Sequence, residues 1–255
     1  MRQVDLNCDM GESYGVYTLG ADELMYGSIT SANIACGFHA GDPSVMRSAV
    51  RQAIAHRVKI GAHPGLPDLI GFGRRKMEVI PDEVYDMITY QVGALQAFAM
   101  QEGSQLHHVK PHGALYNMAA VSPALADAIA QAVHTIDSRL ILYGLAGSEL
   151  IAAGQRAGLS VANEVFADRT YTPDGTLTPR SAAGALITDS ALAVKQVLQM
   201  VMEQQVISVA GTVVPIQADT ICLHGDNAHA VTFARELREQ LEQQHIVIQA
   251  VSANS

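Results

Sequence analysis

Apolar and β-branched runs alternate with amphipathic segments along the whole chain. The short apolar runs predict strands near residues 4–9, 31–36, 58–63, 107–112, 140–145, 160–167 and 220–225. Between these runs, apolar residues recur every three to four positions. This spacing predicts helices that begin at Asp42-Pro43, Pro81 and Ser122-Pro123 and helices that cover about 147–157, 188–204 and 227–243. Repeating strand–helix units favour an α/β protein with a parallel sheet.

Polar residues on one face of nearly every predicted strand distinguish a barrel from an open sheet. Side chains alternate along a strand, so Asp5, Asn7 and Asp9 share one face, opposite an apolar face. Strands of an open sheet that is covered by helices on both sides read instead as continuous apolar runs. We therefore expect a single domain over residues 1–255, folded as a seven-stranded, TIM-like (β/α) barrel with a polar interior. A doubly wound open sheet is the less favoured alternative.

Four histidines stand where an apolar run ends and a glycine turn begins: His39, His63, His112 and His224. In a parallel α/β protein this junction is the carboxyl end of a strand, where active sites are built. Histidine can move protons or bind a metal near neutral pH. The pattern predicts an enzyme, although a core histidine bonded to a backbone carbonyl remains an alternative at His63, and His39 lies past its strand on a turn.

Carboxylates and one lysine share the polar strand faces. Asp9, near the end of the first strand, is a candidate base or a ligand of a metal or water, whereas the deeper Asp5 is expected only to orient Lys59 or Lys110. Lys110 lies between two histidines on the densest polar face. A buried ammonium needs a nearby carboxylate, so Asp5, Asp9 or Glu164 should contact it. Lys110 could then stabilise an oxyanion.

Further polar residues at strand ends and in turns are candidate substrate-binding residues: Asn7, Glu12, His39, Arg74, Arg75, Glu164, Asp168 and Asp226. The guanidinium of Arg74 or Arg75 could bind a carboxylate or phosphate through a bidentate pair, and a plain surface ion pair fits these arginines as well. Asp42 reads as a helix cap. The long irregular stretch 167–185 follows a strand end and predicts an ordered, functional loop in the position of a lid.

Charge and motifs narrow the function. With 25 acidic and 16 basic residues, the net charge of −9 argues against nucleic-acid binding. No apolar stretch reaches the roughly 18 residues of a membrane span, and the first residues do not resemble a secretory signal. Three cysteines without a CxxC pair fit a reduced cytoplasm. The phosphate-loop, GxGxxG and GxSxG motifs are absent.

No tightly bound cofactor is predicted from the sequence. The HExxH motif, paired cysteines and a first-strand HxH are all absent, so we expect no tightly held metal. If a metal is present, Asp9, His63 and His112 are the expected ligands.

Six segments together resemble the LamB/YcsF family, over about residues 4 to 250: DLNCDMGE, SANIACGFHAGD, GAHPGLPDLIGFGRR, VKPHGALYN, EVFADRTY and LHGDN. The resemblance implies a seven-stranded TIM-like barrel related to the glycoside hydrolase/deacetylase barrels. It also implies opening of 5-oxo-L-proline to L-glutamate, coupled to hydrolysis of ATP to ADP and phosphate. ATP is then a co-substrate, with Mg²⁺ placed on a partner subunit, and the implied partners are subunits B and C of a 5-oxoprolinase.

Lactam opening by water needs a base, a proton donor, an oxyanion stabiliser and a clamp for the substrate carboxylate. The candidates for these four roles are, in the same order, Asp9 or His63, His112 or His224, Lys110, and Arg74 or Arg75. Two other functions remain open at this point. One is a stand-alone, metal-dependent deacetylase or amidohydrolase, and the other is a non-catalytic substrate-binding subunit.

Overall fold

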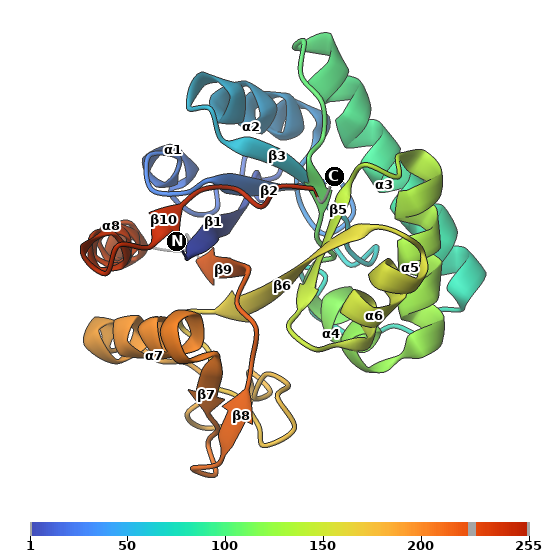
Figure 1. Cartoon of the computed structure of the whole chain (residues 1–255). Coiled ribbons are helices and arrows are strands. Elements are labelled where there is room, and N and C mark those ends of the chain that lie inside the picture. The colour runs from blue at the N-terminus through green and yellow to red at the C-terminus, as the bar shows by residue number, and fades with distance from the viewer. Residues whose placement is uncertain (1, 224–227, 254–255) are drawn as a thin grey trace.

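Seven parallel strands close into a barrel in the computed structural model, which describes residues 2–223 and 228–253 (Figure 1). The barrel strands are, in spatial order, β1 (Gln3–Met10), β2 (Ser31–Ala35), β3 (Lys59–His63), β4 (His108–Val109), β5 (Ile141–Leu145), β6 (Ser160–Phe166) and β9 (Thr220–Leu223). Closure comes from β9, which pairs with β6 on one side and with β1 on the other. The predicted seven-stranded barrel is confirmed.

One barrel strand is much shorter than its apolar run predicts. The sequence indicates a strand near 107–112, but β4 comprises only His108–Val109. Pro111 has no N–H to donate to a neighbouring strand, and Gly113 already begins the next helix. The backbone of Lys110 still donates to the Ala62 carbonyl, at 2.9 Å, so this residue remains fixed against β3.

Helices surround the barrel on its outside (Figure 1). They are α1 (Asp22–Met25), α2 (Pro43–Ala55), α3 (Pro81–Gln101), α4 (Gly113–Val121), α5 (Pro123–Ile136), α6 (Glu149–Arg156), α7 (Ser190–Glu203) and α8 (Ala228–Gln243). The carboxylate of Asp42 caps α2 by accepting from the backbone N–H groups of Ser44 and Val45, as expected. The sequence pattern missed α1, which is one turn long, and α4, because α4 is apolar on most of its surface and lacks an amphipathic pattern.

Three short strands lie outside the barrel. An antiparallel hairpin is formed by β7 (Gln205–Ile207) and β8 (Val213–Pro215). β10 (Val247–Ile248) pairs with the beginning of β1, and the chain after it crosses the amino-terminal end of the barrel (Figure 1). There Val251 packs on a small buried cluster of Ile141, Tyr143 and Ala162 and accepts a hydrogen bond from His107. This end of the barrel is therefore covered by the chain itself.

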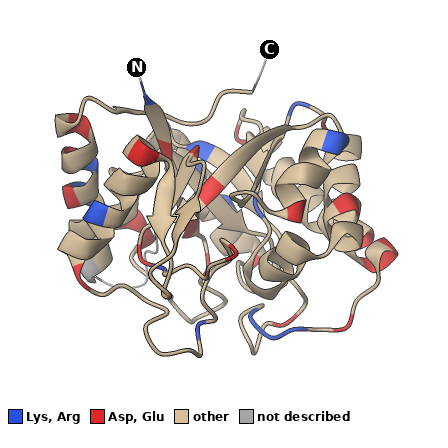
Figure 2. Cartoon of the chain, turned by 60° about the horizontal axis from the view of Figure 1, so that its bottom comes forward, with Lys and Arg blue, Asp and Glu red and all other residues tan. Residues whose placement is uncertain are grey.

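The apolar core lies between the barrel wall and the helices, while the barrel interior is polar. Outward-facing residues such as Leu6, Ile34 and Val109 are fully buried in that core. Acidic residues mark the outer helices on both sides of the barrel, and several basic residues lie in the loops at the end opposite the two termini (Figure 2). Within the described ranges, no helix is both long enough and apolar enough to cross a membrane.

Asp5 anchors a hydrogen-bonded group near the amino-terminal end of the interior, which we call the Asp5 cluster: Asp5, Thr30, Ser31, Tyr143 and Thr220. The hydroxyls of Thr30, Ser31, Thr220 and Tyr143 donate to the Asp5 carboxylate over 2.5, 2.8, 2.6 and 3.1 Å, respectively. The prediction that Asp5 orients Lys59 or Lys110 is therefore wrong, since hydroxyl groups occupy this carboxylate. Burial, only partly offset by these hydrogen bonds, raises the pKa of Asp5.

Candidate active site

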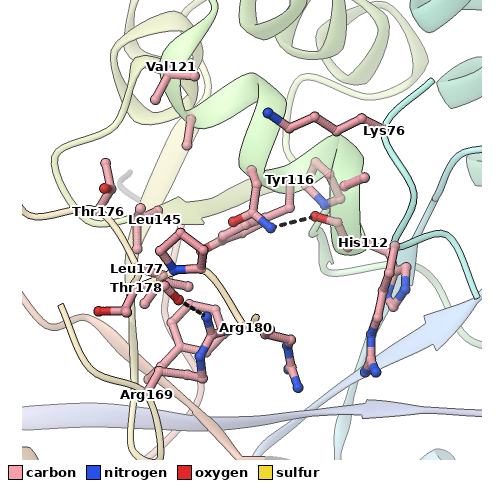
Figure 3. A pocket seen from close by; sticks show the side chains of 18 of the residues that line it. Lys76, His112, Tyr116, Val121, Leu145, Arg169, Thr176, Leu177, Thr178 and Arg180 are labelled. Carbon is pink, nitrogen blue, oxygen red and sulfur yellow. Dashed lines mark hydrogen bonds between the residues drawn. The ribbon is translucent and has the colours of Figure 1, made fainter. Parts of the chain in front are cut away.

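A cavity of about 580 Å³ opens at the carboxyl ends of the barrel strands (Figure 3). Its polar floor contains Asp9, His63, Lys110 and His112. Apolar side chains such as Phe166 complete the lining near the floor. Three of the four strand-end histidines predicted from the sequence belong to one connected group around this floor, and the fourth, His224, lies outside the described residues.

Lys110 is the central cation of the floor. Its Nζ lies 2.9 Å from Asp9 Oδ1, 2.7 Å from Glu164 Oε1 and 3.1 Å from Asn7 Oδ1, and it also contacts Cys222 Sγ at 3.2 Å. We expected a carboxylate to neutralise this buried lysine, and the carboxylates of Asp9 and Glu164 both do so. Burial opposes ionisation of Lys110, but the carboxylates outweigh it and raise the pKa of Lys110 well above its usual value.

Asp9 projects from the end of β1 toward polar groups of three neighbouring segments of the barrel. Asn33 of β2 donates to Asp9 Oδ1 at 2.9 Å, Lys110 contacts the same oxygen, and His63 Nε2 lies 3.2 Å from Oδ2. Burial alone would raise the pKa of Asp9, but His63 and Lys110 outweigh it and hold this pKa well below its usual value. Asp9 is therefore an ionised carboxylate at the cavity floor.

Backbone carbonyls fix the protonated nitrogen of two histidines. His63 Nδ1 lies 2.7 Å from the Lys110 carbonyl, and His112 Nε2 lies 2.9 Å from the Phe72 carbonyl. A carbonyl only accepts, so each of these nitrogens carries the hydrogen. The remaining nitrogens, His63 Nε2 and His112 Nδ1, face each other at 2.9 Å. Burial lowers the pKa of His112 to about 3, which makes its ring neutral at neutral pH.

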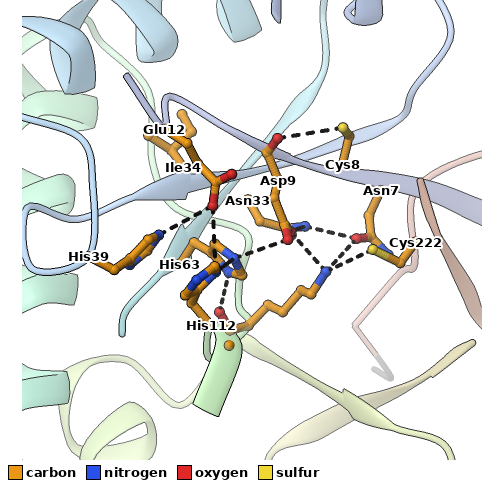
Figure 4. A network of polar contacts seen from close by, with 12 residues as sticks. Asn7, Cys8, Asp9, Glu12, Asn33, Ile34, His39, His63, His112 and Cys222 are labelled. Carbon is orange, nitrogen blue, oxygen red and sulfur yellow. Dashed lines mark hydrogen bonds and ion pairs between the residues drawn. The ribbon is translucent and has the colours of Figure 1, made fainter. Parts of the chain in front are cut away.

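His39 and Glu12 extend this group behind the cavity floor. The His39 ring stacks on the His112 ring with 3.7 Å between centroids and an interplanar angle of 3°. Glu12 Oε1 lies 3.3 Å from His39 Nε2 and 3.5 Å from His112 Nδ1 (Figure 4). Burial lowers the pKa of His39 well below its usual value, so this ring is also neutral.

Glycines near these rings leave the room that the rings occupy. A Cβ at Gly65 would lie 2.6 Å from His39 Nδ1, and a Cβ at Gly73 would lie 2.8 Å from both His112 Cδ2 and His39 Cβ. Gly73 also has a φ of +63°, a conformation that glycine adopts without strain. The AHPG and IGFG segments of the sequence therefore serve to pack the histidines.

Basic side chains line the cavity wall: Arg74, Lys76, Arg169 and Arg180. The predicted long loop is ordered, as expected, and contributes the last two together with the wall residues from Thr176 to Ser181. Arg169 is almost fully buried and donates to the Thr178 carbonyl at 2.6 Å, which anchors the loop (Figure 3). The Arg74 guanidinium lies 4.9 Å from the Phe72 ring centroid.

The other predicted site residues are placed as follows. Asn7 and Glu164 lie inside the barrel against Lys110 rather than at the cavity surface. Arg75 is mostly exposed and pairs with Asp68, outside the cavity lining. Asp168 is half-buried and its side chain is not part of the lining, although its backbone carbonyl accepts from Ile187. Asp226, like His224, falls outside the described residues.

Among the described residues, sequence reasoning missed Asn33 and Cys222 in the barrel interior and Tyr116 at the cavity wall. Asn33 bridges Asn7, Asp9 and the ring of His108, and Cys222 contacts Lys110. Tyr116 lines the cavity from α4. Asn33 has a signal that could have identified it, because it is an isolated polar residue inside the apolar strand SANIA. Tyr116 has none, since it lies on the helix that the pattern did not predict.

Comparisons with known proteins agree on one family. The model of the LamB/YcsF family matches residues 4–255. The A subunit of the 5-oxoprolinase of Geobacillus thermodenitrificans is 62% identical over 251 residues, which cover 98% of each chain. The protein of the same name from Bacillus subtilis is 60% identical over 99% of this chain and 98% of its own length. A crystal structure of a lactam utilization protein from Thermus thermophilus superposes with a TM-score of 0.92 at 47% identity, covering 98% of this chain and all of that one.

Proposed function

The chain belongs to the LamB/YcsF family, and we propose that it is the A subunit of a 5-oxoprolinase, which opens the lactam ring of 5-oxo-L-proline to give L-glutamate. The observation that carries this proposal is the near-complete coverage at about 60% identity with several proteins of that name. Coverage of this extent includes every strand end of the barrel. A cavity with an ionised carboxylate, a buried lysine and a basic wall supports the same chemistry.

We also propose that the reaction consumes ATP and requires partner subunits B and C in the cytoplasm. A five-membered lactam is a poor electrophile, and its ring closure competes with hydrolysis. Transfer of the γ-phosphoryl group to the amide oxygen would activate the carbon for attack by water and release ADP. Opening of the ring would release the amine and leave an acyl phosphate, which a second water would hydrolyse to L-glutamate and phosphate. The described residues of this chain support binding of the lactam and its activated form, and ATP itself is assigned to the complex as a whole.

Asp9 is the proposed base for the attacking water. Its carboxylate lies at the cavity floor, is ionised, and is held by Lys110 and Asn33 through Oδ1. Oδ2 faces His63, and we assign to this oxygen the proton that leaves the water. His63 is less suited to the role, because its Nδ1 is bonded to a carbonyl and its Nε2 faces Asp9 and His112.

Lys110 is assigned an electrostatic role. Four acceptor atoms already surround its ammonium group, so direct donation to an oxyanion would require it to leave one of them. Its fixed charge keeps Asp9 ionised and favours negative charge that develops on the substrate above it. For protonation of the ring nitrogen we propose His224, because the neutral His112 ring already donates its only N–H to Phe72.

The basic wall is proposed to hold the anionic groups of the substrate. Arg74, Lys76 and Arg180 line the cavity of a chain whose net charge is −9, so cations are concentrated at this site. A guanidinium binds a carboxylate or a phosphoryl group in a bidentate way. We assign Arg74 to the substrate carboxylate and the loop arginine Arg180 to the phosphoryl group of the activated lactam.

The test is an assay of glutamate release from 5-oxoproline with the chain alone, with subunits B and C alone, and with all three, each with and without ATP. The proposal expects release only in the complete mixture with ATP. Release by the lone chain that stops when a chelator is added would overturn it in favour of a stand-alone, metal-dependent amidohydrolase. Undiminished release in a mixture that contains Asp9→Asn would instead support a non-catalytic binding subunit.

A further inference from the structure

We propose that Glu12, His39, His63 and His112 form a binding site for one divalent transition-metal ion of the zinc class. One oxygen of Glu12 and one nitrogen of each histidine all lie within 4.8 Å of one another. His63 ends β3, and the other three residues lie in the segments that follow β1, β2 and β4, four strands that are consecutive around the barrel. This inference concerns metal binding by the lone chain and does not depend on the identity of the substrate.

The spacing of the four atoms suits a small ion. Tetrahedral zinc with bonds of about 2.0–2.1 Å separates its ligand atoms by about 3.3 Å. Glu12 Oε1 lies 3.3 Å from His39 Nε2 and 3.5 Å from His112 Nδ1, and His63 Nε2 lies 2.9 Å from His112 Nδ1. An ion can therefore be accommodated when the stacked rings of His39 and His112 turn so that both nitrogens point to it, while all four ligand atoms already lie within 4.8 Å of one another.

The hydrogen bonds of the histidines leave lone pairs where the ion would lie. His63 and His112 each donate the opposite ring N–H to a backbone carbonyl, which is the arrangement that orients metal-binding histidines in proteins. Their other nitrogens face each other and, in neutral rings, both would present a lone pair. Two facing lone pairs repel unless a cation or a proton lies beside them.

The Glu12 carboxylate supplies the negatively charged ligand of the set. Its Oε1 lies directly against the rings of His39 and His112. A divalent ion bound between these groups would form an ion pair with this carboxylate in a largely buried setting.

The donor set selects the class of metal. Three imidazole nitrogens and one carboxylate oxygen favour Zn²⁺, Co²⁺ or Ni²⁺ over Mg²⁺ and Ca²⁺, which prefer oxygen ligands. From the sequence we expected no tightly held metal, and Asp9, His63 and His112 as its ligands if one were present. The geometry replaces Asp9 with Glu12 and His39, since Asp9 is engaged by Lys110 and Asn33.

Metal binding to the full chain tests the proposal without an activity readout. The chain is stripped with a chelator, dialysed and titrated with Zn²⁺ in a calorimeter, and Co²⁺ binding is followed by its visible d–d absorption. We expect one ion per chain, intense tetrahedral Co²⁺ bands and a higher unfolding midpoint with the ion than without it. No binding above that of a chelated buffer blank, or weak six-coordinate Co²⁺ bands alone, would overturn the site.

Variants separate this site from surface histidines. His39→Asn and Glu12→Gln should each weaken Zn²⁺ binding at least about 100-fold, because each removes a direct ligand, and loss of a mere supporting contact already costs 10- to 100-fold. His56→Asn, which changes an exposed histidine on the outside of the barrel, is the matched control and should bind as the parent does. Equal binding by the parent and Glu12→Gln would contradict the proposal. Far-ultraviolet circular dichroism identifies a variant that fails to fold. In that case the Co²⁺ spectrum of the parent tests the site, because tetrahedral bands support it and six-coordinate bands alone contradict it.

Discussion

Asp5 and Asp9 lie four residues apart on the same strand and the same interior face, yet their surroundings are opposite. Asp5 is held by four neutral hydroxyls, and burial raises its pKa. Asp9 is held by an ammonium, an amide and an imidazole, and its pKa is well below the usual value. The alternation of a β-strand brings both carboxylates inside the barrel, but the groups on neighbouring strands shift their pKa values in opposite directions.

The contrast between these two residues separates a structural carboxylate from a reactive one. In the Asp5 cluster the partners are fixed groups of the barrel wall, and Val251 packs on Tyr143 from the covered end. Around Asp9 the charged partners line a cavity that is open to a ligand. We therefore expect changes near Asp5 to affect mainly stability, and changes near Asp9 to affect mainly turnover. Substitutions in the two regions test this division.

Replacing Lys110 should have the largest effect. Lys110→Met leaves the Asp9 and Glu164 carboxylates buried without their counter-ion, and we expect a loss of roughly 3–5 kcal/mol in the free energy of unfolding along with all turnover. Urea unfolding measures the first effect and glutamate release by the full mixture measures the second. The double change Lys110→Met with Glu164→Gln should recover part of the stability and none of the turnover. An unaltered urea midpoint in Lys110→Met would refute the ion-pair argument.

Replacing Asp9 should show most clearly that the surroundings of Asp9 affect turnover and those of Asp5 do not. Asp9→Asn keeps the shape of the side chain but removes the proposed base, so turnover should fall by about 10²–10⁴-fold. Asp5→Asn, the matched change four residues earlier, should keep the turnover per folded molecule within a few-fold. Both variants are measured in the same three-subunit assay after correction for the folded fraction. A larger loss of turnover in Asp5→Asn than in Asp9→Asn would reverse the comparison.

The two neighbouring arginines should differ in substrate binding. Arg74→Ala removes a cation that lines the cavity, and we expect KM for 5-oxoproline to rise by about 10- to 100-fold, because a hydrogen bond to a charged group is worth about 1.5–3 kcal/mol. Arg75→Ala breaks the pair between an exposed guanidinium and the buried Asp68 carboxylate, and it should change KM far less because Arg75 lies outside the cavity lining. Steady-state kinetics over a range of substrate concentrations decide between them. A larger rise in KM for Arg75→Ala than for Arg74→Ala would mean that Arg75, and not Arg74, binds the substrate carboxylate.

The smallest expected effect is the change with pH in the stability difference between the parent and Asp5→Asn. At acid pH, Asp5→Asn should lower the free energy of unfolding by about 1–3 kcal/mol, because it disturbs a buried hydrogen-bonded group. The raised pKa of Asp5 means that the unfolded chain loses this proton first as pH rises through 3.8. As the pH rises from 3.8 to the raised pKa of folded Asp5, the parent loses stability relative to Asp5→Asn. The difference between the free energies of unfolding of the two proteins therefore becomes smaller. Urea unfolding of both proteins over a pH series measures this gap, and a gap that widens with pH would contradict the assignment.

Much of the fold could be predicted because the barrel imposes a simple period on the sequence. Alternation along residues 5–9 and 108–112 identified the interior faces, and the packed helices followed from three-to-four spacing. The helix α4 and the short β4 could not be inferred, since a helix of mostly apolar residues gives no amphipathic signal and Pro111 lacks the N–H that would extend the regular strand pairing. The contact between the side chains of Glu12 and His39 could not be predicted from the sequence either. It depends on two turns that meet only when β1 and β2 pair.

The closure of the barrel between β1 and β9 has a consequence for the synthesis of the protein on the ribosome. β1 emerges from the exit tunnel first, but Thr220, which donates to Asp5, is encoded 215 residues later. Until Thr220 has been synthesised, the edge of β1 that pairs with β9 has no neighbouring strand, and the Asp5 carboxylate lacks one of its hydrogen-bond donors. A nascent chain stalled before Thr220 should therefore remain sensitive to protease, and native resistance should arrive in one step once β9 and β10 have cleared the tunnel.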